Sequence, residues 1–376
     1  MPWQEKSLME LRFAFLERVQ AGRGHFSEVC AAFGISRKTG YKLVARFEAH
    51  GAQGLEDRSR RPLRSPWRVA PQVEARILEL RAQHPAWGGR KLKRRLEDLG
   101  HTGLPSPSTI TEILRRHGRL DGPRTGEPRA WRRFERQAPN ELWQMDFKGH
   151  FGLLEGGRCH TLTVIDDHSR FNLILGACAD QRRTTVKERL TTAFRRYGLP
   201  EQMTMDNGTP WGSSEGSAYT RLSTWLMRLG IRISHSRPFH PQTQGKDERF
   251  HLTLDRELLH RIPLRSHDQI QIELDAWREI YNHQRPHDAL KLATPASRYQ
   301  SSHRSFPEIL PPIVYRSEDI VRQVHGGGQI HFMGRSITVG KALLGQRVAL
   351  RPTPNDGCYD VVFCNQVTRT INLRAI

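Results

Sequence analysis

One stretch of the chain decides how the rest is interpreted, and it reads RPFHPQTQGKDERFHLTL over residues 237–254. Pro238 and Pro241 exclude helix and sheet from its first half, because proline lacks an N–H donor and biases the preceding residue toward extended backbone. From about Gly245 the pattern changes, and apolar residues from Phe250 onward recur at helical spacing. This change predicts a helix that follows a rigid loop.

The first turn of the predicted helix holds two carboxylates, Asp247 and Glu248, between Lys246 and Arg249. The helix dipole favours carboxylates at this end. Acid and base together at the start of a helix, directly after a rigid loop, suit a metal ion and a phosphodiester. An ordinary acidic first turn explains these residues equally well when they are taken alone.

Two further carboxylates lie on short predicted strands. Asp146 belongs to the alternating segment Trp143–Phe147, and Asp206 ends the segment Met203–Asp206. A hairpin turn is the alternative explanation of Asp206, but no alternating strand follows it. Two aspartates on strands and one glutamate on a helix, Glu248, form a donor set for two-metal phosphoryl transfer, because hard oxygen ligands hold Mg²⁺.

Short motifs in a fixed order extend this pattern over residues 143–299. They are Trp143 with Asp146, VIDDHSR at 164–170, DNG at 206–208, GI at 230–231 with Ser234, HPQT at 240–243, GKDERF at 245–250, and YN at 281–282 with RPH at 285–287. In this order they resemble the catalytic core of DDE transposases of bacterial insertion sequences, which is similar to the core of retroviral integrases.

The resemblance implies a ribonuclease H-like α/β core with a mixed sheet. Carried over, it makes Asp146, Asp206 and Glu248 the catalytic and metal-binding residues, with Mg²⁺ as the cofactor or Mn²⁺ in its place. Forty-one residues separate Asp206 from Glu248, a longer stretch than is usual in the family. The Gly- and Ser-rich segment 211–216 is the natural place for the extra residues. Gln244, where many relatives have Asn, is a second departure, and neither departure removes a ligand.

The order of predicted elements agrees with such a core. Three strands are followed by alternating helices and strands, which predicts a mixed sheet flanked by helices. The predicted strands span 143–147, 160–166, 171–177, 202–206 and 231–235, and the predicted helices span 184–197, 219–229, 245–260 and 270–283. Asp166 and Asp167 are rival carboxylates, but their place between an apolar strand and Ser169 favours an ordinary turn.

Composition points to a polyanionic partner. The chain has 376 residues and a net charge of +20, and residues 1–139 hold 28 Lys and Arg against 15 Asp and Glu. Double-stranded DNA is the straightforward partner, with binding that weakens as salt rises, whereas a solvated basic surface is the alternative. No apolar run reaches membrane-spanning length and the first residues do not resemble a signal peptide, so we expect a cytoplasmic protein. The five scattered cysteines predict reduced thiols, and without a His/Cys spacing no structural zinc is expected.

Residues 1–56 have the pattern of an all-α helix-turn-helix domain. A short helix over 26–33, a glycine turn and a basic helix from Arg37, capped by Ser36, make up the motif. Arg37, Lys38 and Lys42 would face DNA. Gly40 is a flaw in such a helix, because glycine costs about 1 kcal/mol there relative to alanine. A three-helix core without DNA binding is the alternative.

Further basic segments connect this domain to the core. Residues 57–70 form a basic linker, residues 71–118 a second helical DNA-binding domain, residues 119–139 another basic linker, and residues 140–299 the catalytic core. The expected DNA contacts in these parts are Arg58, Arg60 and Arg61 in the first linker, Lys91, Lys93 and Arg94 in the second helical domain, and His240, Lys246 and Arg249 near the catalytic site.

Residues 313–376 consist of short apolar strands between glycine turns, which predicts a small β-barrel. The predicted strands span 329–332, 336–339, 347–350, 359–364 and 370–373. Taken together, the sequence predicts a transposase that binds the ends of a mobile DNA element, nicks them and joins the 3′-hydroxyls to target DNA, acting as a homo-oligomer. The alternatives are a catalytically silent DNA-binding regulator and a nuclease without strand transfer.

Overall fold

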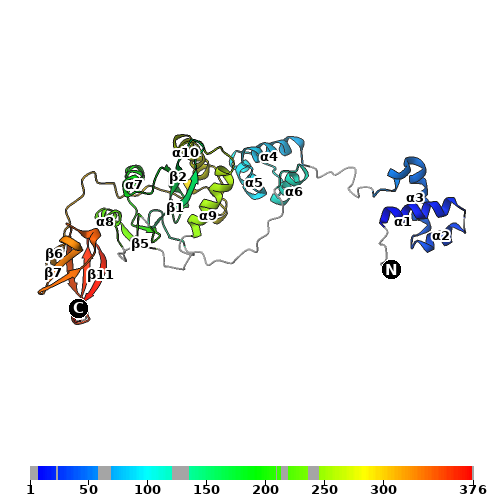
Figure 1. Ribbon diagram of the computed structural model, residues 1–376. Coiled ribbons are helices and arrows are strands. Elements are labelled where there is room, and N and C mark those ends of the chain that lie inside the picture. Colours follow the sequence, from blue (N-terminus) through cyan, green and yellow to red (C-terminus); the bar gives the residue numbers. More distant parts are fainter. Residues whose placement is uncertain are drawn as a thin grey trace. The chain divides into compact units, whose positions relative to one another are not determined.

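The computed structural model describes residues 7–22, 24–57, 69–120, 135–208, 210–212, 219–235 and 245–374. The chain divides into two compact units, Met1–Arg68 and Val69–Ile376 (Figure 1). Each unit has its own apolar core. None of the helices in the described ranges is long and apolar enough to cross a membrane.

The first unit is a small helical domain. It consists of α1 (Leu8–Gln20), α2 (Phe26–Ala32) and α3 (Arg37–His50), followed by the short 3-10 helix η1 (Gly51–Leu55). The Ser36 side chain accepts a hydrogen bond from the Thr39 amide, which confirms the predicted cap of α3. Gly40 is buried, and a Cβ built there would lie 2.6 Å from Cys30 Sγ on α2. The glycine is therefore what lets α2 and α3 pack closely, rather than a flaw in the helix.

A second helical group opens the second unit. It contains α4 (Pro71–Gln83), α5 (Gly89–Asp98) and α6 (Pro107–Arg116). Trp87 and the buried side chains of the three helices, among them Ile77, Leu92 and Ile110, share one apolar cluster. The Ser106 side chain caps α6 by accepting a hydrogen bond from Thr109 N.

The core is a five-stranded mixed sheet in the order β3-β2-β1-β4-β5. Its strands are β1 (Trp143–Gly152), β2 (Arg158–Asp166), β3 (Asn172–Cys178), β4 (Gln202–Met205) and β5 (Arg232–His235), and its helices are α7 (Arg183–Tyr197), α8 (Arg221–Arg228), α9 (Gly245–Leu254) and α10 (His267–His283). The first three strands pair antiparallel, and β4 and β5 add in parallel. The predicted mixed sheet and the order of its elements are thereby confirmed.

Helices cover both faces of this sheet (Figure 1). One apolar cluster joins Trp143 and Met145 of β1 to α7 and α8. The other joins Ile165 of β2 and Leu175 of β3 to α9 and α10. After Leu254, α9 continues into a π-helical turn, η3 (Asp255–Leu259). Because side chains alternate along a strand, each residue of β1 faces one of these two layers.

Side-chain amides form hydrogen bonds with backbone N–H and C=O groups on both edge strands of the core sheet, β3 and β5. On β3, Gln271 accepts from Ala177 N at 2.9 Å and donates to Leu175 O at 3.0 Å, while Asn282 makes the same two-way contact with the backbone of Asn172 at 2.8 and 3.0 Å. On β5, Gln366 accepts from Ile233 N at 3.0 Å and donates to Ile233 O at 2.9 Å. These pairs occupy the backbone groups that a further strand would need.

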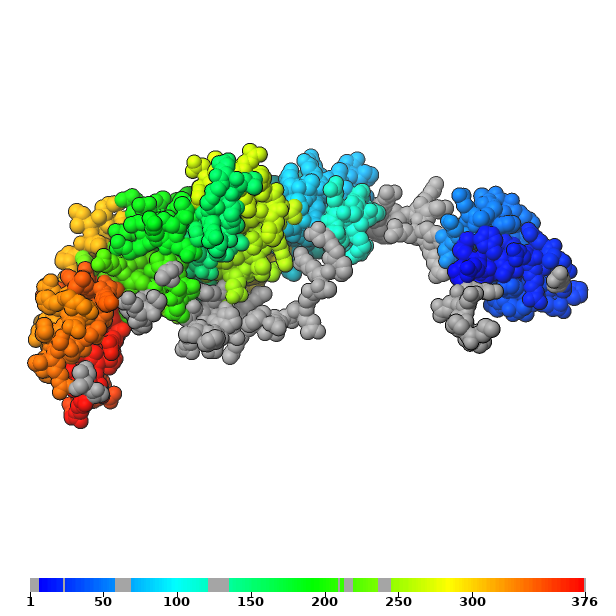
Figure 2. Space-filling model, in the orientation of Figure 1, coloured from blue at the N-terminus to red at the C-terminus, as the bar shows by residue number. Residues whose placement is uncertain are grey.

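The C-terminal residues form two open sheets instead of the predicted barrel. Strands β6 (Ile320–Gln323), β9 (Arg347–Pro352), β10 (Cys358–Phe363) and β11 (Gln366–Asn372) make a four-stranded sheet in the order β11-β10-β9-β6, and β7 (Gln329–Phe332) forms a two-stranded sheet with β8 (Arg335–Thr338). Closure would require β6 and β11 to pair, but they lie at opposite edges. The C-terminal sheets lie directly against the core (Figure 2). Their apolar side chains share one buried cluster with the core, so burial does not depend on closing a barrel.

Candidate active site

The alternation of β1 points Asp146 toward the layer of α9. Trp143 and Met145 point into the opposite layer with α7 and α8. Asp146 lies directly opposite Thr163 of β2 in the antiparallel register. The Thr163 hydroxyl donates to Asp146 O at 3.0 Å and contacts His251 Nε2 of α9 at 2.8 Å. One side chain thus connects the strand that carries Asp146 to the helix that carries Glu248.

Asp206 follows β4, the parallel neighbour of β1. The register pairs Gln144 with Thr204, so Asp146 and Asp206 stand at the same level two residues further along adjacent strands. Asp206 Oδ1 accepts from the amide of Gly208 at 3.1 Å, and its carbonyl oxygen contacts His235 Nδ1 at 2.9 Å. These bonds shape the turn after the strand and leave Asp206 Oδ2 outside the turn's hydrogen bond.

The shifted pKa of Asp146 shows that the third carboxylate, Glu248, lies nearby. Burial, followed by the negative charge of Asp206 and, to a smaller extent, that of Glu248, raises the pKa of Asp146 to about 7, although a hydrogen bond from the Phe147 backbone acts in the opposite direction. Like charges affect each other in this way only when they are neighbours. Glu248 is exposed in the first turn of α9. The structure therefore places both Asp206 and Glu248 within electrostatic reach of Asp146.

Their arrangement is not a finished ligand cage. Within the described ranges, no group of three or more His, Cys, Asp or Glu side chains is arranged so that it could hold a metal ion. The charge effects on Asp146 are compatible with the lack of a preformed metal site. Coulomb interactions extend well beyond the roughly 2.0–2.6 Å at which oxygen ligands contact Mg²⁺ or Ca²⁺. The carboxylates are neighbours that do not yet converge on one point.

A fourth carboxylate, Asp247, lies beside this group. Its side chain is completely buried, and neither oxygen has a hydrogen-bond partner among the residues that the structure describes. Burial, followed by the charges of Asp146 and Asp167, raises the pKa of Asp247 well above its usual value. Of the two acids in the first turn of α9, the buried one is thus Asp247 and the accessible one is Glu248.

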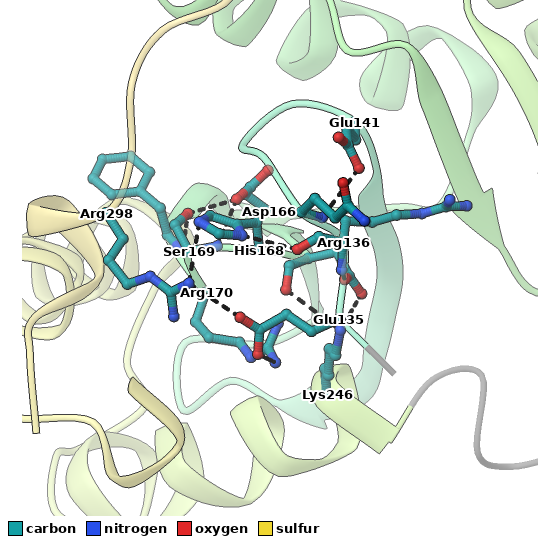
Figure 3. Close-up of polar contacts among 12 residues, drawn as sticks. Glu135, Arg136, Glu141, Asp166, His168, Ser169, Arg170, Lys246 and Arg298 are labelled. Carbon is teal, nitrogen blue, oxygen red and sulfur yellow. Dashed lines mark hydrogen bonds and ion pairs between the residues drawn. The ribbon is translucent and has the colours of Figure 1, made fainter. Parts of the chain in front are cut away.

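The two aspartates of the VIDDHSR motif have different roles. Asp166 accepts from Ser169 N at 2.8 Å, Ser169 Oγ at 2.6 Å and Asn140 N at 2.7 Å, which confirms the turn chemistry that the sequence predicts for it (Figure 3). Asp167, which is fully buried, accepts from Gln144 Nε2 of β1 at 2.7 Å and pairs with Lys246 of α9. A turn does not explain Asp167. In the sequence, this role of Asp167 is indicated solely by its position as a second acid directly after an apolar strand.

The predicted DNA contacts divide into three groups. Arg37, Lys38 and Lys42 are exposed on α3, and Arg249 is exposed on α9, so all four are accessible to a phosphate. Lys91, Lys93 and Arg94 on α5 and Lys246 on α9 form ion pairs with Asp288, Glu97, Asp98 and Asp167 respectively. Arg58, Arg60, Arg61 and His240 lie outside the described residues. The contacts themselves stay predictions.

Lys91 is the most enclosed of the predicted contacts on α5. Its Nζ lies 3.6 Å from Asp288 Oδ2, and its side chain is 15% exposed. Burial, followed by the nearby charge of Arg285, lowers the pKa of Lys91 to about 8. In this arrangement Lys91 faces the core, whereas Arg115 and Arg116 at the end of α6 are exposed.

Five family models match the chain. The integrase core domain matches residues 136–241 and 229–295, and the C-terminal domain of IS481 family transposases matches residues 319–375. A homeodomain-like domain matches residues 39–114 and a helix-turn-helix domain matches residues 12–62. Both predicted DNA-binding regions thus match helical DNA-binding families.

Similar proteins carry related descriptions. An insertion element IS407 uncharacterized 31.7 kDa protein of Burkholderia multivorans is 28% identical over 45% of this chain and 58% of its own length. The transposase for transposon Tn552 of Staphylococcus aureus is 28% identical over 59% of this chain and 51% of its own length. The chain therefore spans little more than half the length of these two relatives.

Among solved structures, a chain of the simian T-cell lymphotropic virus intasome in complex with PP2A regulatory subunit B56 gamma matches 78% of this chain and 99% of its own, with 18% identity and a TM-score of 0.38. The family models match the helical regions, the core and the C-terminal region of the chain. The models of the core and the C-terminal region describe parts of integrases and transposases, in agreement with the insertion-element relatives. Together these matches support a transposase of an insertion element with an integrase-like core.

Proposed function

We propose that the chain is a DNA transposase that binds the ends of a mobile element, nicks them and joins the freed 3′-hydroxyls to target DNA. The observation that carries the proposal is the charge coupling of Asp146 to Asp206 and Glu248, inside the region that matches the integrase core. Two carboxylates that act electrostatically on a third, carried by two adjacent strands and a helix, form a donor set for phosphoryl transfer.

The residues fit a divalent cation by charge and by donor chemistry. Burial and the negative charges of Asp206 and Glu248 raise the pKa of Asp146, and a bound cation would favour the ionised form of this carboxyl. Carboxylate oxygens are the ligands that Mg²⁺ and Mn²⁺ accept. Asp146, Asp206 and Glu248 would hold the ion. When bound, such an ion lowers the pKa of the attacking hydroxyl and stabilises the negative charge on the leaving oxygen.

The chain's other residues would position the DNA. Arg249 is exposed one residue after Glu248. Its guanidinium group could form a bidentate contact with a DNA phosphate. In the nicking step a water oxygen bonds to phosphorus and the 3′ oxygen leaves with a proton. In the joining step that 3′-hydroxyl bonds to a target phosphorus and displaces the 3′ oxygen of the target. Both steps transfer one phosphoryl group and need no covalent intermediate with the protein.

The test replaces each carboxylate by its neutral amide. Asp146→Asn, Asp206→Asn and Glu248→Gln should each reduce strand joining to background and leave DNA binding close to wild type, because a charged ligand is lost with little change of shape. The measurement is a joining assay with the inverted repeats that flank the coding region. Glu279→Gln, an exposed glutamate on α10 that pairs with His283 at 3.5 Å, is the matched control.

Retained joining in any one of the three variants would show that this residue is not a ligand. A chain that cuts element ends but never joins them would be a nuclease without strand transfer. A chain that binds the ends and does neither would be a DNA-binding regulator.

A further inference from the structure

Asp167 is a buried junction between the two elements that carry Asp146 and Glu248. Its Oδ1 accepts from Gln144 Nε2 at 2.7 Å and from Lys246 Nζ, and the side chain is 0% exposed. Lys246 Nζ also reaches the Asp167 carbonyl oxygen at 3.3 Å. Gln144 precedes Asp146 by two residues on β1, and Lys246 precedes Glu248 by two residues on α9. A single carboxylate therefore connects the backbone segments of both.

The same carboxylate fixes the chain where it enters the core. Asp167 Oδ2 accepts from the backbone amide of Arg136 at 2.8 Å, and His168 Nδ1 contacts Arg136 O at 2.8 Å (Figure 3). Glu135 contacts Arg170 and Arg298, each at 3.2 Å. The three donors to the Asp167 carboxylate in the described part of the chain thus belong to β1, to α9 and to the segment that enters the core.

We propose that Asp167 and Lys246 are positioning residues, which hold the first turn of α9 against β1 so that Glu248 stays in reach of Asp146. The proposal rests on the proposed function and deepens it. It also gives Lys246 a role different from the phosphate contact that the sequence predicts. The ammonium group already has a buried anionic partner, and the side chain is only 19% exposed. A buried carboxylate with three donors holds its neighbours in a fixed geometry.

The two roles of Lys246 predict opposite results. A positioning residue acts through Asp167, so Lys246→Met, Asp167→Asn and the double variant should show the same loss. Residues that orient metal ligands change metal affinity or activity about 10–100-fold when they are replaced. A phosphate contact acts on DNA instead, so Lys246→Met would weaken binding and reduce the salt dependence by about one counterion, while Asp167→Asn would do neither.

The experiment uses the full chain and three readouts. The first is the single-turnover joining rate at saturating duplex that carries the flanking inverted repeat. The second is the affinity for that duplex as a function of salt, and the third is Mn²⁺ affinity without DNA, followed by electron paramagnetic resonance. We expect Lys246→Met and Asp167→Asn each to lower the joining rate and the Mn²⁺ affinity about 10–100-fold, with the double variant no worse than either. DNA affinity and its salt dependence should stay those of the wild type.

Two control variants separate positioning from a general loss of structure. Lys246→Arg keeps a cation at Asp167 and should recover most of the rate, which a loss of folding would not allow. Lys187→Met is the matched control on α7, where Lys187 lies over the Trp225 ring, and it should change neither the joining rate nor the Mn²⁺ affinity. The melting temperature of every variant is measured alongside.

Three outcomes would overturn the proposal: losses that multiply in the double variant, a changed salt dependence in Lys246→Met with wild-type joining at saturating DNA, or losses that follow the melting temperature and are not recovered by Lys246→Arg. A wild-type chain that binds Mn²⁺ but joins no DNA would refute the proposed function alone. In that case the Mn²⁺ affinities would still decide whether Asp167 and Lys246 position Glu248.

Discussion

At the scale of single residues, the notable pair is Asp247 and Glu248, neighbours that the fold treats in opposite ways. Asp247 is completely buried, and neither of its oxygens has a hydrogen-bond partner within the described ranges, whereas Glu248 is exposed. Burial raises the pKa of Asp247 well above its usual value, so the folded state is less stable at pH 8, where the unfolded chain ionises this carboxyl freely. We therefore expect Asp247→Asn, which cannot ionise, to raise the free energy of unfolding at pH 8. Denaturant titration in the presence of a chelator measures this change, and the variant should retain joining activity. If Asp247→Asn instead folds normally and loses both Mn²⁺ binding and joining, Asp247 is the ligand on α9 and Glu248 is not.

At the scale of elements, α9 is fastened to the sheet by polar side chains along its length. Beyond Lys246, His251 contacts the Thr163 hydroxyl, and Asp255 of η3 pairs with Lys148 of β1 at 2.8 Å. Burial, followed by the charge of Lys148, lowers the pKa of His251 to about 4. The unfolded chain, in which histidine titrates near 6.5, therefore binds a proton between pH 6.5 and 4 that the folded chain does not, so stability is lost as the pH falls through this window.

The variant His251→Gln keeps a nitrogen donor for Thr163 but cannot titrate. Between pH 7 and pH 4 the wild type should lose on the order of 2 kcal/mol more unfolding free energy than this variant. Denaturant unfolding at several pH values provides the comparison. His287, whose pKa burial lowers to about 3, is present in both proteins and cancels. Equal losses in the two proteins would mean that His251 is not held neutral by the fold.

At the scale of the whole molecule, two element ends must meet one target, which a single active site cannot serve at once. Symmetric dimers are the commonest solution among oligomers, and a basic linker over 119–139 would let one protomer bind an end while its core acts on the other. We expect a mixture of two inactive proteins, Glu248→Gln and the double variant Arg37→Ala/Lys42→Ala, to regain joining activity. Each protein must first be shown to fold and to associate. A mixture that stays inactive under those conditions would mean that each protomer cuts the end that it binds, with the linker only separating two domains.

The sequence by itself determined what depends on neighbouring residues. The alternation of residues 143–147 was enough to predict β1, the spacing from Phe250 onward was enough to predict α9, and Ser36 was enough to mark the start of α3. Periodicity and capping are local properties, and the motif order added the family resemblance. The predicted triad followed from these and is consistent with the charge coupling at Asp146.

Only the tertiary structure decided what depends on residues far apart in the chain. It showed that Asp167 pairs with Lys246, 79 positions away, that Asp247 is the buried acid of α9, and that Gly40 is needed because Cys30 lies against it. It also corrected the barrel to two open sheets, since a list of strands does not state which edges pair. Burial, ion pairing and strand closure are set by contacts between distant segments, and a single sequence carries no direct record of those contacts.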